Sequence, residues 1–321
     1  MKVCSKLLLL ASLLCTPLVA SAQPYPSKPL RIVIGFSAGG VIDGFARLLA
    51  PRLSASLGQP VIIDNRPGAN GIVAMEQVAK AAPDGYTLFL GTLGNLSLNQ
   101  IFYRNLPYDA ERDFAPITQV NSISLLLVSH PSLPVKSVNE LVQFVRAQPG
   151  RSNYASAGNG SSPNLAAEMF NSAAGIKAIH VPYKGSGQAF TDLLAGQVQF
   201  MFDAVAIGMP YVRNGQLRAI ATTGRERLAI LPDVPTVAES LPGFEVTNWY
   251  GFVAPKGTPD DILLRLQNEV SKAVNSPEMR DKMLSEGMVP VGSTPEQFRG
   301  YIKSETARWD KIIKDANIRV E

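Results

Sequence analysis

The chain has 321 residues, a formal net charge of +4 and an apolar fraction of 46%. Removal of the first 22 residues, which contain two lysines, would lower the charge to +2, and so small an excess does not indicate a nucleic-acid-binding protein. A chain of this length can bury enough apolar surface for two domains.

The first 22 residues have the pattern of a secretory signal peptide. Lys2 and Lys6 form a basic start, residues 7–19 are an apolar core, and Ala20 and Ala22 supply the small residues that precede a cleavage site. We therefore expect an exported protein whose mature chain begins at Gln23.

Both cysteines, Cys4 and Cys15, fall inside this N-terminal segment. The mature chain would then have no cysteine, which excludes disulfides, zinc–thiolate sites and cysteine nucleophiles. A lipid anchor on Cys15 is an alternative, but Leu14 is bulky where a small residue is expected before it. No later segment is apolar over the ~18 residues that a membrane-spanning helix needs, so we expect a soluble protein, periplasmic in a Gram-negative source.

The mature chain opens with a strand, a glycine-rich loop and a helix. Residues 30–34 are an apolar run typical of a buried parallel strand, and Ile42, Phe45 and Leu49 follow at helical spacing. Unpaired backbone N–H groups and the positive end of the helix dipole meet in the loop between them, so it is a candidate anion-binding site. Asp43, one turn into the helix, is placed to turn its side chain back onto the loop. The loop consists of Phe36, Ser37, Ala38, Gly39 and Gly40.

Two other interpretations of this loop remain open. Gly35, Ser37 and Gly39 match the Gly-x-Ser-x-Gly of a hydrolase nucleophile elbow, which also lies between a strand and a helix. That motif needs a histidine base, and the chain has only His130 and His180. An elbow normally follows several strands, whereas this loop follows the first mature strand. The last interpretation is a purely structural turn.

Alternating strands and helices continue along the chain and predict a parallel sheet. Residues 61–63, 86–90 and 114–120 are expected to be strands, separated by helical segments. Thr92, which follows the strand 86–90, could donate its hydroxyl to a ligand or cap its own turn. The sequence leaves both roles open.

A second unit repeats this architecture without repeating the sequence. The strand 124–128 leads to a helix whose capping box is formed by Ser137 and Glu140. A strand ending at Ser156 then enters a glycine- and serine-rich loop, and Pro163 occupies the first turn of the next helix. The two units predict two α/β domains, each with a loop-to-helix start on its binding edge.

Three further side chains of the second unit are candidates for ligand contact. Tyr183 and Lys184 lie at a strand end, where Lys184 would pair with a carboxylate or remain a solvated surface charge. Asp203 follows a strand and would accept from a ligand amino group, contact water or orient the hinge. Neither histidine has carboxylate or cysteine neighbours at ligand spacing, so we predict no metal site and no cofactor.

The chain then returns to its first unit. Residues 248–253 are expected to be a strand of the first domain, and three helices with explicit starts follow, which we interpret as packing elements. The predicted division is a first lobe of residues 23–120 and 224–321 and a second lobe of residues 121–223. The helix starts are Thr258-Pro259, Ser276-Pro277 and Thr294-Pro295.

With these residues in view, the chain closely resembles the substrate-binding receptors of tripartite tricarboxylate transporters, the Bug-type periplasmic proteins. No single matching segment is diagnostic, but their order and spacing together are specific. The resemblance implies a type II-like, two-lobed periplasmic binding protein of the α/β class. Each lobe would be a mostly parallel sheet flanked by helices, with a two-segment hinge between them. The matching segments are residues 25–29, 39–43, 61–68, 83–86, 180–185, 231–236 and 249–251.

The resemblance also implies where a ligand binds. A small carboxylate would lie in the cleft between the lobes, against the loop from Phe36 to Gly40 with Asp43 on its helix. Asn164 stands where relatives often have histidine, so the chain keeps a hydrogen-bonding group there but no titratable ring. The first loop also lacks the prolines that relatives commonly have before the glycines. The second-lobe loop supplies Gly158, Ser161, Ser162 and Asn164.

Three classes of function remain. A transport receptor, expected to be a monomer without catalysis, would capture a small carboxylate and deliver it to the membrane subunits of a tripartite tricarboxylate-type transporter. A periplasmic sensor would report its ligand to a membrane signalling protein instead. A serine hydrolase would use Ser37. The resemblance, the export signal and the paired loops favour the transport receptor.

Overall fold

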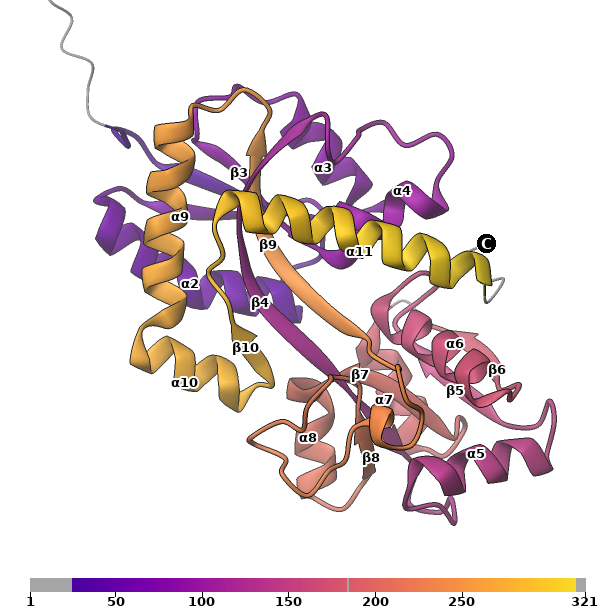
Figure 1. The fold of residues 1–321 in the computed structure, drawn as a ribbon. Coiled ribbons are helices and arrows are strands. Elements are labelled where there is room, and N and C mark those ends of the chain that lie inside the picture. The colour runs from indigo at the N-terminus through magenta and orange to yellow at the C-terminus, as the bar shows by residue number, and fades with distance from the viewer. Residues whose placement is uncertain (1–24, 184, 316–321) are drawn as a thin grey trace, which may run out of the picture.

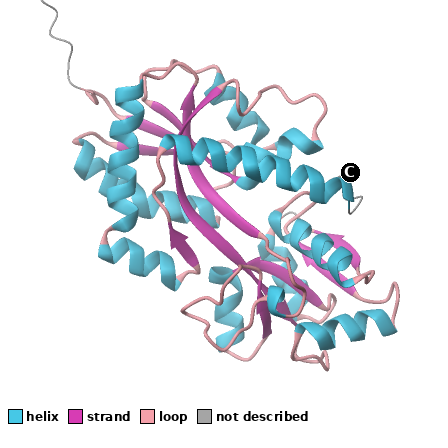
Figure 2. Ribbon diagram, viewed as in Figure 1, coloured by secondary structure: helices cyan, strands magenta, loops and turns pink. Residues whose placement is uncertain are grey.

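The computed structural model describes residues 25–183 and 185–315, which form a mixed α/β protein with two lobes (Figures 1 and 2). The predicted signal peptide, residues 1–22, lies outside the described residues. The strands are β1 (Leu30–Ile34), β2 (Val61–Asn65), β3 (Thr87–Thr92), β4 (Phe114–Ser129), β5 (Asn153–Ser156), β6 (Ile179–Pro182), β7 (Phe200–Ala204), β8 (Arg218–Thr222), β9 (Thr247–Pro255) and β10 (Met288–Pro290).

Helices and short helical turns connect these strands. The α-helices are α2 (Val41–Leu57), α3 (Ile72–Ala79), α4 (Asn99–Phe102), α5 (Val138–Ala147), α6 (Ser162–Ala174), α7 (Ser186–Leu194), α8 (Val205–Arg213), α9 (Asp260–Asn275), α10 (Pro277–Ser285) and α11 (Pro295–Asp315). The turns are η1 (Ala69–Gly71), the π-helical η2 (Gly94–Leu98) and η3 (Val237–Glu239).

Strand β4 joins the two lobes. Its first part pairs with β9 as far as Ser124, which lies opposite Thr247, and the rest pairs with β7 and β8. The sequence predicted two strands here, 114–120 and 124–128, and that prediction was wrong. The residues between them contain neither glycine nor proline, so nothing ends the strand.

Each lobe contains a group of parallel strands whose carboxyl ends share one edge. In the first lobe these are β2, β1 and β3, and in the second they are β6, β5 and β7. Strands β4, β8, β9 and β10 join them through antiparallel pairs, so the sheet is mixed where the sequence predicted mostly parallel pairing. The mixture arises because both lobes share β4, and β9 runs back beside it in the opposite direction.

The strand register turns these two edges toward each other. Thr92, at the carboxyl end of β3, lies beside Tyr250 near the start of β9. Ala204, at the carboxyl end of β7, lies beside Leu125 of β4. Both positions adjoin the level at which β4 leaves β9 and enters the second lobe. Loops that follow the parallel strands of one lobe therefore face the loops of the other.

Helices pack on both faces of each half of the sheet (Figure 1). In the first lobe α2 and α9 share one apolar cluster, and α3 and α11 pack on the opposite face. In the second lobe α7 and α8 cover one face, and α5 and α6 cover the other. The predicted lobe boundaries, between residues 120 and 121 and between residues 223 and 224, stay a prediction.

The helices that cover the sheet bury one apolar face each. In α9 the buried residues recur every three or four positions, at Leu263, Leu266, Val270 and Val274.

Gly251 in β9 tests this packing. A Cβ atom there would lie 2.1 Å from Cζ of Phe298, a fully buried residue of α11. We expect Gly251→Ala to lower the free energy of unfolding by about 1–3 kcal/mol, because the ring has to move in a packed core. Gly300 in the same helix has no neighbour within 4 Å of such an atom, so Gly300→Ala should leave stability unchanged or raise it by up to about 1 kcal/mol. Urea unfolding measures both; equal destabilisation would contradict the packing.

Candidate functional site

The carboxyl edge of the first lobe is built by loops that follow β1, β2 and β3. These loops are packed backbone against backbone, since a Cβ atom on Gly35 would lie 2.5 Å from Cα of Gly71. Gly71 has a φ of +78°, which a residue with a side chain rarely adopts. Close approach of the two loops therefore requires glycine at both positions.

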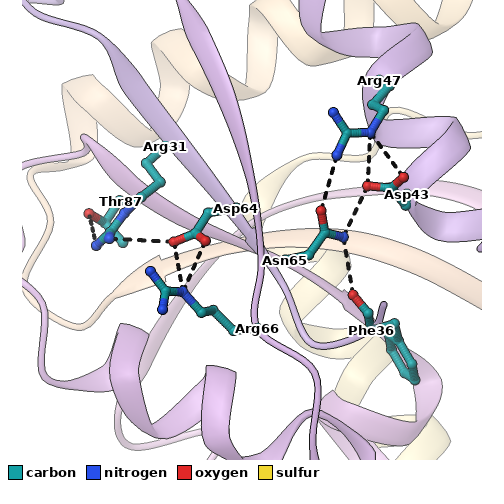
Figure 3. A network of polar contacts seen from close by, with 8 residues as sticks. All are labelled: Arg31, Phe36, Asp43, Arg47, Asp64, Asn65, Arg66 and Thr87. Carbon is teal, nitrogen blue, oxygen red and sulfur yellow. Dashed lines mark hydrogen bonds and ion pairs between the residues drawn. The ribbon is translucent and has the colours of Figure 1, made fainter. Parts of the chain in front are cut away.

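Asp43 holds the glycine-rich loop in place (Figure 3). Its carboxylate accepts hydrogen bonds from Gly39 N at 2.9 Å, Arg47 Nε at 2.9 Å and Asn65 Nδ2 at 3.0 Å. Asn65, at the end of β2, also donates to the carbonyl oxygen of Phe36 at 3.1 Å. The hydrogen bond from Arg47 is the main cause that holds the pKa of Asp43 below its ordinary value. The loop is therefore fixed before any ligand arrives.

This arrangement leaves part of the loop available. Residues 37–40 are exposed and precede α2, a helix of 17 residues. The Gly39 amide is used by Asp43, but among the described residues no acceptor takes the amides of Ser37, Ala38 or Gly40. Three free donors at a helix N-terminus suit an anion, and Arg47 offsets the negative charge of Asp43 beside them.

Arg66 belongs to a neighbouring surface network (Figure 3). Its Nε donates to both carboxylate oxygens of Asp64 at 2.9 and 3.1 Å, and Arg31 lies 3.6 Å from the same carboxylate. Arg66 thus stabilises its own turn.

Thr92 caps the turn that follows β3. Its hydroxyl donates to Oδ1 of Asn95 at 3.0 Å, and Nδ2 of Asn95 donates to the carbonyl oxygen of Asn70 at 2.6 Å. Asn99 also donates to that carbonyl and to Tyr108 Oη. Capping was one of the two roles left open for Thr92, and its contact with a ligand stays a prediction. The asparagine network was missed, because its partners lie up to 29 residues apart in the chain.

The loop of the second lobe is held by its own helix. Ser161 caps α6 by accepting from Asn164 N, and its hydroxyl donates to the carbonyl oxygen of Gly158 at 2.6 Å. The Asn164 side chain accepts from Gly160 N at 3.0 Å and donates to Tyr154 Oη at 3.0 Å. Asn164 is only 5% exposed, so its amide is engaged within the lobe. Ser162, at the first position of α6, lies beside it on the loop.

His180 is a site residue that the sequence did not predict. Its ring stacks on Tyr154 at 4.9 Å, and its Nε2 lies 2.7 Å from Oγ of the buried Ser156. Nδ2 of Asn164 lies 3.4 Å from Nδ1 of the same ring. Burial lowers the pKa of His180, which favours the neutral imidazole. No local pattern signalled this role, because His180 lies within β6 and its partners Tyr154, Ser156 and Asn164 belong to β5 and α6.

The hydroxyl group of Tyr183 is already engaged by another side chain. Its hydroxyl donates to Oδ2 of Asp192 at 2.6 Å, and burial together with this bond raises the pKa of Tyr183 to about 12. Lys184, predicted beside it, lies outside the described residues.

Asp203 is a buried carboxyl group at the end of β7. It is 5% exposed, and Oδ1 accepts from Ala204 N at 2.6 Å. Oδ2 accepts no hydrogen bond from the described residues. Desolvation by burial raises the pKa of Asp203 to about 6. Burial raises the pKa of Tyr250 on β9 and the nearby Asp203 carboxyl adds to this effect, so these side chains lie near each other where the lobes meet.

The structure bears on two alternatives, a serine hydrolase that uses Ser37 and a metal site. His180 bonds to Ser156 and His130 to Ser132, so neither of the two histidines of the chain is paired with Ser37. Within residues 25–183 and 185–315 no group of three His, Asp or Glu side chains could hold a metal ion. In the same ranges no helix has the length and apolar character to cross a membrane.

Two cavities lie away from these loops. One of about 660 Å³ lies beneath α11, between that helix and the start of β4, and its rim includes Lys256, Arg299 and Lys303. Another of about 310 Å³ lies behind the crossing strands, beside Ser124 and Gly287. Neither is lined by the glycine-rich loop or by the loop of α6.

Two lobes that share long strands and turn polar loops toward each other define a periplasmic binding protein. A family model described as the tripartite tricarboxylate transporter family receptor matches residues 45–318. The chain belongs to this family, as its resemblance to the Bug-type receptors predicted.

Individual relatives agree with this assignment. Protein BugT of Bordetella pertussis is 35% identical over 303 residues, which cover 94% of this chain and 93% of BugT. The structure of R. palustris Rpa4515 with adipate is 36% identical, covers 92% of this chain and 99% of its own, and has a TM-score of 0.86. MatC from Rhodopseudomonas palustris with bound malate is 33% identical, with coverages of 90% and 100% and a TM-score of 0.80. The matched family is described as a receptor, and a further similar solved structure is that of the periplasmic binding protein BugD, 32% identical with a TM-score of 0.83.

The tie between Asn65 and the glycine-rich loop can be tested by substitution. Asn65→Ala removes the bonds to Phe36 and Asp43, so we expect a loss of about 1–3 kcal/mol in unfolding free energy and faster hydrogen exchange at residues 37–41. Arg66→Ala next to it removes only an exposed ion pair and should change stability by less than about 0.5 kcal/mol. Unchanged exchange in Asn65→Ala would show that the loop is held by other contacts.

Asp203 should make stability depend on pH. Its folded pKa of about 6 lies above the ordinary value near 4, so its contribution is fully present below about pH 4 and is lost as pH rises through 6. Asp203→Asn cannot ionise, so relative to the parent its unfolding free energy should improve by up to about 3 kcal/mol between pH 4 and pH 8.

Denaturant unfolding at both pH values measures this difference. The matched control is Asp281→Asn, because Asp281 is exposed on α10 and its removal should shift the pH dependence by less than about 0.5 kcal/mol. A difference between Asp203→Asn and the parent that is the same at both pH values would show that Asp203 does not titrate in this range.

Proposed function

We propose that this protein is a periplasmic solute-binding receptor. It captures a small carboxylate between its lobes and delivers it to the membrane subunits of a tripartite tricarboxylate-type transporter. The observation that carries the proposal is the set of exposed amides at Ser37, Ala38 and Gly40, in a loop fixed at the start of α2 on the edge that faces the second lobe, in a chain of this receptor family.

The first lobe supplies directional donors for a carboxylate. Backbone N–H groups cannot lose a proton or be displaced, and the N-terminal end of α2 adds a favourable partial charge. Because Asp43 and Asn65 already order the loop, little conformational entropy is lost when the anion binds. Asp43 is a positioning residue in this proposal, and Thr92 lies at the adjoining strand end.

The second lobe completes the shell around the anion. In this proposal the loop from Gly158 to Asn164 offers Ser161, Ser162 and Asn164 to the ligand, because it lies at the start of α6 on the edge that faces the first lobe. Neither loop alone replaces the water around a carboxylate, so the ligand binds more tightly when both contact it and thereby favours closure. Tyr183, Lys184 and Asp203 are proposed at the far end of the ligand.

The class of ligand follows from the donors and from the relatives. Solved structures of two similar proteins contain adipate and malate, both small carboxylates. We propose a ligand of this class, a monomeric receptor, export with cleavage before Gln23, and no catalytic step. A sensor that reports to a signalling protein would bind its ligand in the same way, so transport is tested separately by uptake of the bound acid in cells that lack the receptor.

The role of the glycine-rich loop can be tested with a side chain that blocks access to its backbone amides. Gly40 has a φ of −77°, which valine adopts without strain, and a Cβ atom there meets only the Ser37 carbonyl at 3.5 Å. Gly40→Val should therefore fold but block the anion, with a loss of about tenfold or more in affinity for the cognate acid, which calorimetry measures. Gly44→Val, one turn along the same helix at an exposed site without neighbours, is the control and should bind like the parent.

A substitution in the loop of the second lobe tests the other half of the proposed site. Asn164→Ala removes an amide that orders Gly160 and contacts Tyr154 and His180, so we expect a ten- to hundredfold loss of affinity, about 1.5–3 kcal/mol. Parent-like binding of the cognate acid by both Gly40→Val and Asn164→Ala would place the site elsewhere.

A further inference from the structure

The cavity beneath α11 lies apart from the loops that the proposed function uses. It has a volume of about 660 Å³ and is lined by α4, the start of β4 and α11, which belong to the same face of the first lobe (Figure 1). Small-molecule sites typically have volumes of about 300–1,000 Å³. Because all of its walls belong to one lobe, occupancy of this cavity does not require the lobes to close.

Apolar side chains form the walls of the cavity. Ile101 of α4, Phe114 at the start of β4 and Ile302 of α11 line it. The neutral polar side chains of the lining are already used, since Gln100 Nε2 and Thr306 Oγ1 donate to carbonyl oxygens four residues earlier, at 3.0 and 2.9 Å. The walls therefore suit the apolar body of a ligand.

Three basic side chains stand at the rim. These rim cations are Lys256, just after β9, and Arg299 and Lys303 of α11. Among the described residues none of the three side chains takes part in an ion pair or hydrogen bond. Arg299 and Lys303 are four residues apart, so two like charges share one side of the helix and destabilise it slightly. An anion bound at the rim would relieve this repulsion.

The acidic residues of the lining do not balance the rim cations. Asp310 is paired with Lys314 at 2.7 Å, which leaves Glu111 to oppose three positive charges. The described part of α11 ends at Asp315, about 18 Å along the helix from Lys303. The described residues therefore leave an excess of positive charge beside the apolar walls.

We propose that the cavity beneath α11 is a second ligand site, which binds an amphipathic organic anion. The rim cations hold the acidic head group, and the aliphatic or aromatic body lies against the apolar walls. The glycine-rich loop offers directed backbone donors, whereas this site combines side-chain cations with burial of apolar surface. A free acid and an anionic lipid share this chemistry. The cavity suits the free acid, because a lipid in a bilayer would keep its chains there.

Calorimetry with octanoate tests the second site. The parent should bind octanoate about tenfold or more tightly than butanoate, whose body buries less apolar surface. The double variant Arg299→Gln, Lys303→Gln removes two rim cations, so its affinity for octanoate should fall about fivefold or more. Both side chains are exposed, so the double variant should fold. Lys311→Gln changes an exposed lysine of α11 that does not line the cavity, and it should bind octanoate like the parent.

Gly40→Val separates this cavity from the region between the lobes. It should bind octanoate like the parent, and the double variant should keep the affinity of the parent for the cognate acid. Loss of octanoate binding in Gly40→Val, with no change in the double variant, would place octanoate between the lobes and contradict the second site. The proposed function would then stand. Its own failure leaves this test intact, because the double variant and Lys311→Gln need octanoate alone.

Two further results would overturn the inference. The first is a parent that does not bind octanoate, whether or not it binds vesicles of phosphatidylglycerol. The second concerns the end of the chain as the competing occupant. A variant that ends at Asp315 should bind octanoate like the parent, and a gain of about fivefold or more would show that residues 316–321 fill the cavity.

Discussion

The antiparallel pairing of β4 with β9 is the constraint on which the rest of the structure depends. Because β4 leaves β9 at Ser124 and continues into the second lobe, one strand fixes the position of both sheets. Pairing with β9 in the first lobe and with β4 in the second sets the direction of the parallel strands, so their carboxyl edges face each other. Polar loops at carboxyl edges are where open α/β sheets bind ligands, so the shared strand pair creates a binding region from two separate sheets.

The two facing loops are ordered in different ways. In the first lobe a single carboxylate, Asp43, gathers a loop amide and two side chains and leaves other amides free. In the second lobe the order comes from a chain of neutral groups, in which Asn164, Tyr154 and His180 bond or stack on one another. Tyr154 continues this chain by donating to Glu168. The carboxylate of Asp43 is buried and paired with Arg47, so its negative charge is offset beside the free amides of the first loop.

Local chemistry in the sequence was enough to predict several helix starts and the glycine-rich loop. Ser137 and Ser161 cap their helices, and Asp43 folds back onto the loop, because each contact spans only three or four residues. The predicted start at Thr258-Pro259 was wrong by one residue, because α9 begins at Asp260 and the Thr258 hydroxyl donates to the carbonyl oxygen of Pro255 instead of capping the helix. Asn65 and His180 were missed, since their partners are 16 to 29 residues away and meet only in the folded sheet. The two-lobed fold was recognised from the order of short segments, whereas the continuity of β4 depends on the absence of a breaker, a weak signal.

The Ser124–Thr247 pair has a consequence for how such receptors diversify. Strand β4 leaves the first lobe after Ser124 and β9 enters it at Thr247, at neighbouring points on adjacent strands roughly 5 Å apart. Both ends of the described chain belong to the first lobe (Figure 1). The strands β4 and β9 thus cross between the lobes at a single pair of neighbouring residues. Recombination at this junction would exchange half of the binding surface in one event and leave the anion loop of the other half intact.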